Sequence, residues 1–131
     1  MLIETNFGPS KAIDRASFET VSFDVFDTIL LRRCTTPNGV FEMACRLAGC
    51  DIARPGLVDS FTQHRSLAEA KARKAAFEQS GTGEVTIEQI YARFPRRLFG
   101  LEHLSCEELA EVEFQAELEL CVANPDVLSF Y

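Results

Sequence analysis

The segment 20–31 (Thr-Val-Ser-Phe-Asp-Val-Phe-Asp-Thr-Ile-Leu-Leu) joins a run of β-branched and aromatic residues to two carboxylates and a threonine. Such a run is typical of a buried parallel strand, and the sequence predicts a strand at about 20–26. A carboxylate beside a buried strand is costly unless it is paired, hydrogen-bonded or bound to a cation. Because strand ends in open α/β sheets border the ligand crevice, Asp24 is a candidate nucleophile or metal ligand. The alternative is an aspartate that caps the turn after the strand.

The order of residues in this segment resembles the first motif of the haloacid dehalogenase (HAD) superfamily. In that motif an apolar strand ends in a nucleophilic aspartate, and a threonine follows at a fixed offset; Asp24 and Thr28 hold these positions here. The resemblance implies that Asp24 forms a covalent aspartyl intermediate and that Thr28 orients it by a hydrogen bond. The alternative for Thr28 is a local turn made by its hydroxyl. The resemblance spans roughly residues 18 to 131 and is carried further by Arg32, Arg33, Pro37, Phe41, Phe61, Arg65 and the segments 84–91 and 117–125.

The motif departs from the HAD phosphatase pattern at two positions. The general acid/base of HAD phosphatases stands two residues after the nucleophile, and here that residue is Phe26, which is closer to the dehalogenase branch. Asp27 stands where the family usually has glycine, so it is a candidate relocated acid/base, with a backbone-bonding turn residue as the alternative. The resemblance also implies a Mg²⁺ ion shared by the Asp24 carboxylate and the Phe26 carbonyl. The remaining metal ligands and the later family motifs are expected beyond Tyr131.

Two arginines are candidates for binding an anionic group of a substrate. Arg32 follows the motif directly. Arg65 lies four residues before Glu69, which lies four before Arg73, so the three form one stripe on a predicted helix. An arginine in such a stripe can clamp a phosphate or carboxylate if the stripe faces a cleft. The alternative is a solvated ladder of ion pairs, which adds little to stability.

The rest of the chain has helical periodicity, and the capping signals divide it into separate helices. Thr36 is the predicted N-cap of a helix that Gly49 ends, and residues 57–80 form a long helix. Further helices are predicted at about 87–94, 106–122 and from 125 onward. The first two begin with capping boxes, of Thr86 with Gln89 and of Ser105 with Glu108, and Asn124 caps the third. The predicted fold is an α/β parent fold of HAD type, of which this chain is the predominantly α-helical part with one core strand. The expected divisions are 1–35 (strand and nucleophile motif), 36–123 (helical cap) and 124–131 (start of a helix returning to the core).

The composition of the chain narrows the classes of partner that it is expected to bind. A net charge of −7 argues against nucleic acid or an anionic membrane surface, and no apolar run has the length of a membrane span. Five cysteines without a CxxC pair indicate reduced thiols and a cytoplasmic protein.

Two functional hypotheses follow. The first is the N-terminal part of a HAD-like hydrolase acting on a phosphorylated or otherwise anionic small metabolite, as in predicted hydrolases that are sometimes fused to glycosyltransferase segments. These 131 residues alone are expected to be inactive and to bind Mg²⁺ weakly or not at all. The second is a non-catalytic helical interaction or oligomerisation module. In either case a homodimer is expected through the apolar strand at 20–26 and an apolar stripe formed by Phe114, Leu118 and Cys121.

Overall fold

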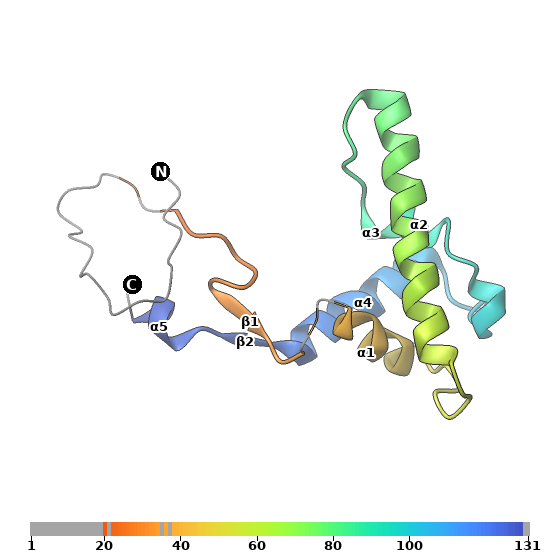
Figure 1. The fold of residues 1–131 in the computed structure, drawn as a ribbon, viewed down its shortest axis with the longest axis horizontal. Coiled ribbons are helices and arrows are strands. Elements are labelled where there is room, and N and C mark those ends of the chain that lie inside the picture. The colour runs from red at the N-terminus through yellow and green to blue at the C-terminus, as the bar shows by residue number, and fades with distance from the viewer. Residues whose placement is uncertain (1–19, 21, 35, 37, 130–131) are drawn as a thin grey trace. The chain divides into compact units, whose positions relative to one another are not determined.

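The chain is described by a computed structural model at residues 20, 22–34, 36 and 38–129, and it divides into two units (Figure 1). One unit comprises Met1–Arg32 and Cys121–Tyr131, and the other is the continuous segment Arg33–Leu120. The predominantly helical composition predicted from the sequence is confirmed. Since the chain leaves the first unit after Arg32 and re-enters it at Cys121, the helical unit is an insertion between two segments of the first.

The first unit is organised by a two-stranded antiparallel sheet. Strand β1 (Leu30–Arg32) pairs with β2 (Cys121–Ala123) in the register Leu30↔Ala123, Leu31↔Val122 and Arg32↔Cys121. The backbone pairing extends one residue beyond the strands, because the Asn124 amide donates to the Ile29 carbonyl oxygen at 2.8 Å. The short helix α5 (Pro125–Leu128) follows β2.

The predicted position of the first strand, 20–26, is wrong for the described residues of that range, because the first regular strand is β1. A tight turn separates the two positions. The Leu30 amide donates to the Val25 carbonyl at 2.8 Å, the Asp27 amide donates to the Leu30 carbonyl at 2.7 Å, and Asp27 has a left-handed φ of 60°. The apolar run continues through Ile-Leu-Leu at 29–31, so its composition alone does not locate the strand within it.

The helical unit contains four α-helices and one 3₁₀ helix among its described residues. They are α1 (Gly39–Leu47), α2 (Leu57–Ser80), α3 (Ile87–Tyr91), the 3₁₀ helix η2 (Arg96–Phe99) and α4 (Cys106–Leu120). The bounds of α2 are those predicted. Three ends differ from the prediction: Asn38 rather than Thr36 precedes α1, α3 ends at Tyr91 rather than near Phe94, and α4 ends at Leu120 rather than Val122.

The core of the helical unit lies where α1 and α3 pack between α2 and α4 (Figure 1). Phe61 from α2 is fully buried, with ring centroids 4.9 Å from Phe94 and 5.3 Å from Phe99. Small residues let the helices approach each other closely, and Ala44 on α1 and Ala116 on α4 have no exposed surface. This core fixes α2 and α4 against each other and so positions the side chains that they share.

Candidate functional site

The predicted nucleophile lies in an exposed turn of the first unit. Asp24 is exposed, and its Oδ1 accepts a hydrogen bond from the Val25 amide at 3.0 Å. Val25 and Phe26, the two residues that follow, are exposed as well. A carboxylate in this setting is well hydrated and open to a ligand from solvent. The contact with its neighbouring amide is also what a turn-capping aspartate makes, so the geometry is compatible with both roles predicted for Asp24.

Asp27, Arg32 and Phe26 form a cluster beside this turn. Arg32 Nη1 lies 3.3 Å from Asp27 Oδ2, and the Arg32 guanidinium carbon lies 4.6 Å from the centre of the Phe26 ring. The positive φ of Asp27 is a conformation that aspartate tolerates better than most residues, which accounts for an aspartate in this turn. The structure therefore brings together three of the residues singled out from the sequence, and it gives the carboxylate of Asp27 a cationic neighbour.

Thr28 is held in place through its backbone. The Asn124 side chain donates from Nδ2 to the Thr28 carbonyl oxygen at 2.9 Å, and Asn124 is buried. The Asn124 side-chain oxygen also accepts the Asp126 amide at 3.1 Å, which caps α5 as predicted. Asn124 thus connects the turn after Asp24 to the segment that follows β2, a link across the chain that the sequence pattern did not reveal.

The Mg²⁺ site that the resemblance implies would lie at Asp24. The described residues contain no group of three or more His, Cys, Asp or Glu side chains placed to hold a metal ion. Asp24 and the carbonyl of Phe26 supply two oxygen ligands, and the nearby Arg32 guanidinium opposes a cation.

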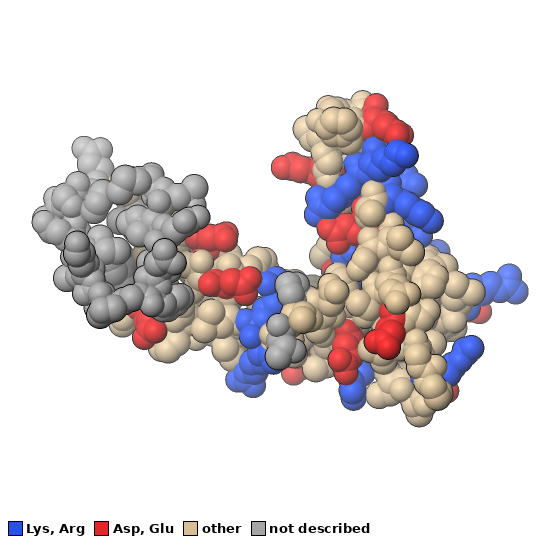
Figure 2. Space-filling view, in the orientation of Figure 1, with Lys and Arg blue, Asp and Glu red and all other residues tan. Residues whose placement is uncertain are grey.

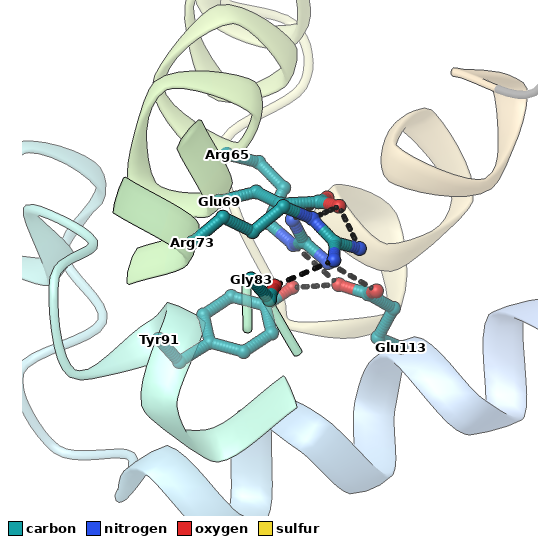
Figure 3. Close-up of polar contacts among 6 residues, drawn as sticks. All are labelled: Arg65, Glu69, Arg73, Gly83, Tyr91 and Glu113. Atoms are coloured by element: carbon teal, nitrogen blue, oxygen red, sulfur yellow. Dashed lines mark hydrogen bonds and ion pairs between the residues drawn. The ribbon is translucent and has the colours of Figure 1, made fainter. Parts of the chain in front are cut away.

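The second group of polar side chains lies in the helical unit and is centred on Arg65 (Figure 3). Arg65 on α2 is 3% exposed and donates from Nε and Nη2 to the two carboxylate oxygens of Glu113 on α4, at 2.8 and 2.7 Å. Tyr91 on α3, 1% exposed, donates its hydroxyl to Glu113 Oε2 at 2.7 Å. The Arg65 guanidinium also lies 4.7 Å from the centre of the Phe41 ring. Side chains from four helices, including Phe41 of α1, therefore meet at one buried ion pair.

The predicted stripe of Arg65, Glu69 and Arg73 forms and continues this network toward solvent. Glu69 Oε2 accepts from Arg65 Nη1 at 2.9 Å, and Glu69 Oε1 accepts from Arg73 Nε at 2.9 Å. Arg73 Nη1 then donates to the carbonyl of Gly83 at 3.0 Å, which fastens the loop after α2 to the helix (Figure 3). The inner end of the stripe is buried rather than solvated, so its contribution to stability differs from that of a surface ladder.

The charges in this network stabilise one another. Burial alone lowers the pKa of Arg65, but the hydrogen bonds and charge of Glu113 outweigh it and the pKa is raised. Burial, followed by the charge of Glu113, raises the pKa of the Tyr91 hydroxyl, which stays protonated as a donor. Partial burial opposes ionisation of Glu69, yet the hydrogen bonds from Arg73 and Arg65 leave its pKa lowered. Within the described residues no buried side-chain nitrogen or oxygen lacks a hydrogen-bond partner.

Sequence reasoning missed Glu113 and Tyr91 as partners of Arg65. Glutamates recur along α4 and most of them are exposed, as on a solvated face, whereas Glu113 is 6% exposed. The spacing of Glu113 in the sequence does indicate its burial, because it lies four residues after Leu109 and three before Ala116, both of which are buried. A charge at that spacing lies on the apolar side of a helix, where it needs a partner of opposite charge.

An open hollow of about 660 Å³ lies on the helical unit and is lined in part by Asn38 and Met43. Its charged lining residues are Arg33 and Arg46 against Glu42 and Asp59, and Arg46 Nη2 is paired with Glu42 Oε1 at 3.2 Å. Since two cations face two anions, this hollow has no preference for an anionic ligand.

Comparison with known proteins returned neither a matching protein-family model nor a matching curated protein. Among the described residues no helix is long and apolar enough to cross a membrane.

Proposed function

We propose that this chain supplies the nucleophile turn and the helical cap of a HAD-like hydrolase that acts on a phosphorylated or otherwise anionic small metabolite. The proposal is carried by the insertion of the helical unit, Arg33–Leu120, between β1 and β2 directly after the Asp24–Thr28 turn. The first-motif resemblance places the nucleophile at Asp24, and the insertion follows it at the point where a cap is expected.

The connection to the helical unit supports its assignment as a cap. The Arg33 amide donates to the Leu120 carbonyl at 2.7 Å, so the chain enters and leaves the unit through hydrogen-bonded neighbours. The unit has its own core and its own buried ion pair. A cap that moves as one rigid body needs internal contacts of this kind. A cap joined to a catalytic domain through paired strands can open to admit a substrate and close to exclude water.

The proposed reaction runs through the exposed carboxylate of Asp24. One Asp24 oxygen attacks the phosphorus of a phosphate monoester, the bond from phosphorus to the leaving oxygen breaks, and an aspartyl phosphate forms. The leaving oxygen takes a proton from solvent, or from Asp27 when that carboxyl group is protonated. Water then attacks the phosphorus, the bond to Asp24 breaks and its carboxylate is regenerated, and the protons of the water stay on the released phosphate or pass to solvent. Arg32, which lies beside Asp27 and Phe26, is the cation of this turn to which we assign the substrate anion.

Arg65, the other arginine proposed to bind a substrate anion, is fully engaged in the helical unit. Its guanidinium is buried against Glu113 and Glu69, an arrangement that favours a structural role over contact with a substrate. We therefore propose that Arg65 maintains the shape of the cap and that Arg32 takes the binding role.

The test uses the natural gene product with every residue that its reading frame encodes. It is incubated with Mg²⁺ and a panel of sugar phosphates, aryl phosphates and 2-haloalkanoic acids, and release of phosphate or halide is measured. We expect turnover of at least one class, lowered at least about 10⁴-fold in Asp24→Asn. The control is Asp126→Asn, an exposed carboxylate of the same unit, which should keep full activity. No turnover of any class, or turnover that survives Asp24→Asn, contradicts the proposal.

A further inference from the structure

The outward face of α4 carries two acidic and two apolar side chains in one stripe. Glu107, Glu111, Phe114 and Leu118 follow one another at intervals of four, three and four residues, which places them on the same side of the helix. Phe114 is 51% exposed and Leu118 is 55% exposed, although both are large apolar residues. The opposite side of α4, which contains Leu109, is buried in the core. These four residues form the α4 stripe, an acidic and apolar surface in which Glu111 Oε1 accepts a hydrogen bond from Gln115 Nε2 of the same helix at 2.7 Å.

The outward face of α2 carries the opposite charge at a matching spacing. Leu67, Lys71 and Lys74 lie at intervals of four and three residues and are all exposed, Leu67 at 55%. Lys and Arg side chains gather over the C-terminal half of α2 (Figure 2). Lys74 Nζ is 4.0 Å from Glu78 Oε1, a long and exposed contact that leaves its charge available to a partner. These three residues form the α2 stripe.

We propose that the α2 stripe of one copy of this chain binds the α4 stripe of a second copy. When the two helices are placed antiparallel, Glu107 and Glu111 lie opposite Lys74 and Lys71, and Phe114 lies opposite Leu67. The acidic pair is four residues apart and the basic pair three, each about one helical turn, so both ion pairs form at once. The long aliphatic stems of the two lysines add apolar surface around Phe114.

Charge identifies a second copy as the occupant. The α4 stripe repels nucleic acid and anionic membranes, and its apolar residues are flanked by acids that require a basic and apolar partner surface. The α2 stripe is a surface of that kind, with the same spacing, on the same chain. The whole chain has a net charge of −7, so its copies would otherwise repel each other, and association depends on this local complementarity. A two-fold axis relating the two copies would form the contact twice.

This inference replaces the surface expected for the homodimer. The sequence suggested pairing through an apolar strand at 20–26, and the described residues of that range form no regular strand. Phe114 and Leu118 were part of the surface expected from the sequence, and they are exposed as that expectation requires. The inference rests on the helical unit and is independent of the proposed hydrolase activity.

The experiment is sedimentation equilibrium of the full chain over a dilution series. We expect the wild-type mass to rise from one copy toward two with concentration. Lys71→Glu with Lys74→Glu makes both stripes acidic, and Glu107→Lys with Glu111→Lys makes both basic, so each double variant alone should associate at least about tenfold more weakly. An equimolar mixture of the two double variants regains complementary stripes at both contacts and should associate as the wild type does.

Three controls separate this contact from other effects. Arg97→Glu with Glu102→Lys reverses two exposed charges elsewhere on the helical unit and should leave association unchanged. Circular dichroism checks that each variant folds, because Glu107 also lies in the first turn of α4. Phe114→Ser removes the apolar contact without altering charge and should weaken association as well. A wild-type chain that stays monomeric, double variants that still associate, or a mixture that does not regain association would each overturn the proposal.

Discussion

The Arg65 guanidinium and the Glu113 carboxylate form a buried, two-pronged ion pair, with Nε–Oε2 and Nη2–Oε1 distances of 2.8 and 2.7 Å. The two residues are 48 positions apart and come from α2 and α4. Their geometry is that of a planar guanidinium matched to a planar carboxylate, the strongest form of this interaction. Because Tyr91 from α3 donates to the same carboxylate, the pair ties together three helices of one unit.

Removing one member of this pair should destabilise the helical unit strongly. Arg65→Met leaves the Glu113 carboxylate buried without its cation, and we expect a loss of about 3–5 kcal/mol in the free energy of unfolding. Urea unfolding followed by circular dichroism measures it. The matched control is Arg46→Met, whose exposed ion pair with Glu42 should contribute about 0–1 kcal/mol. Combining Arg65→Met with Glu113→Leu and Tyr91→Phe should recover much of the loss, because neither an unpaired charge nor an unpaired buried hydroxyl then remains. If Arg65→Met lowers the free energy of unfolding by less than Arg46→Met does, Arg65 does not have this stabilising role.

The capping box before α4 should contribute measurably to stability. Ser105 Oγ accepts the Glu108 amide at 3.1 Å, and Glu108 Oε2 accepts the Ser105 amide at 2.8 Å. We expect Ser105→Ala to lower the free energy of unfolding by about 1 kcal/mol, because one amide of the first turn loses its acceptor. Ser66→Ala, at an exposed position inside α2, is the control and should be neutral or slightly stabilising. Equal effects of the two substitutions would show that the cap contributes nothing.

Local signals in the sequence predicted the helices well. The bounds of α2 follow from a long alanine-rich pattern that ends at Gly81, which adopts a φ of 76°. The capping boxes at Thr86 and Ser105 formed as predicted, since each depends on residues three apart in the chain. Interactions of this range are encoded within one turn, so a single sequence reveals them.

Long-range pairing was harder to predict. The strand position was wrong because the apolar run from Thr20 to Leu31 contains a turn at Asp27 that its composition does not mark. The partnership of Arg65 with Glu113 joins residues on separate helices, and helical spacing shows which side a residue faces but not which residue it meets. The stripe of Arg65, Glu69 and Arg73 was predicted correctly because it lies within one helix.

The buried thiol of Cys45 should make stability fall at alkaline pH. Burial, followed by a hydrogen bond with Cys50, raises the pKa of Cys45 to about 12. A thiol in an unfolded chain ionises near pH 8.5, so between about 8.5 and 12 the unfolded state binds fewer protons than the folded state. The free energy of unfolding therefore decreases as pH rises through this window. Unfolding measured at about pH 8 and about pH 10 should show this decrease, and Cys45→Ala should show a smaller one.

Alkylation gives an independent check on the same thiols. Cys45 and Cys50 are buried, whereas Cys34, Cys106 and Cys121 are partly exposed. Because the thiolate is the reactive form, iodoacetamide should modify the buried pair much more slowly than the other three in the folded chain. Peptide mapping by mass spectrometry identifies the modified residues. Labelling of Cys45 as fast as Cys34 would show that the C-terminal end of α1 opens readily.

The turn at Asp24 should bind Mg²⁺ poorly in these 131 residues alone. Asp24 and the Phe26 carbonyl offer two ligands, Mg²⁺ gives up its hydration shell reluctantly, and Arg32 places a positive charge beside Asp27. Calorimetric titration should show no binding tighter than about the millimolar range, with the same result for Asp24→Asn. The chain should likewise release no phosphate from an aryl phosphate, because Phe26 stands at the acid/base position. Micromolar Mg²⁺ affinity that is lost in Asp24→Asn but kept in Asp126→Asn would mean that Asp24 already lies in a complete metal site.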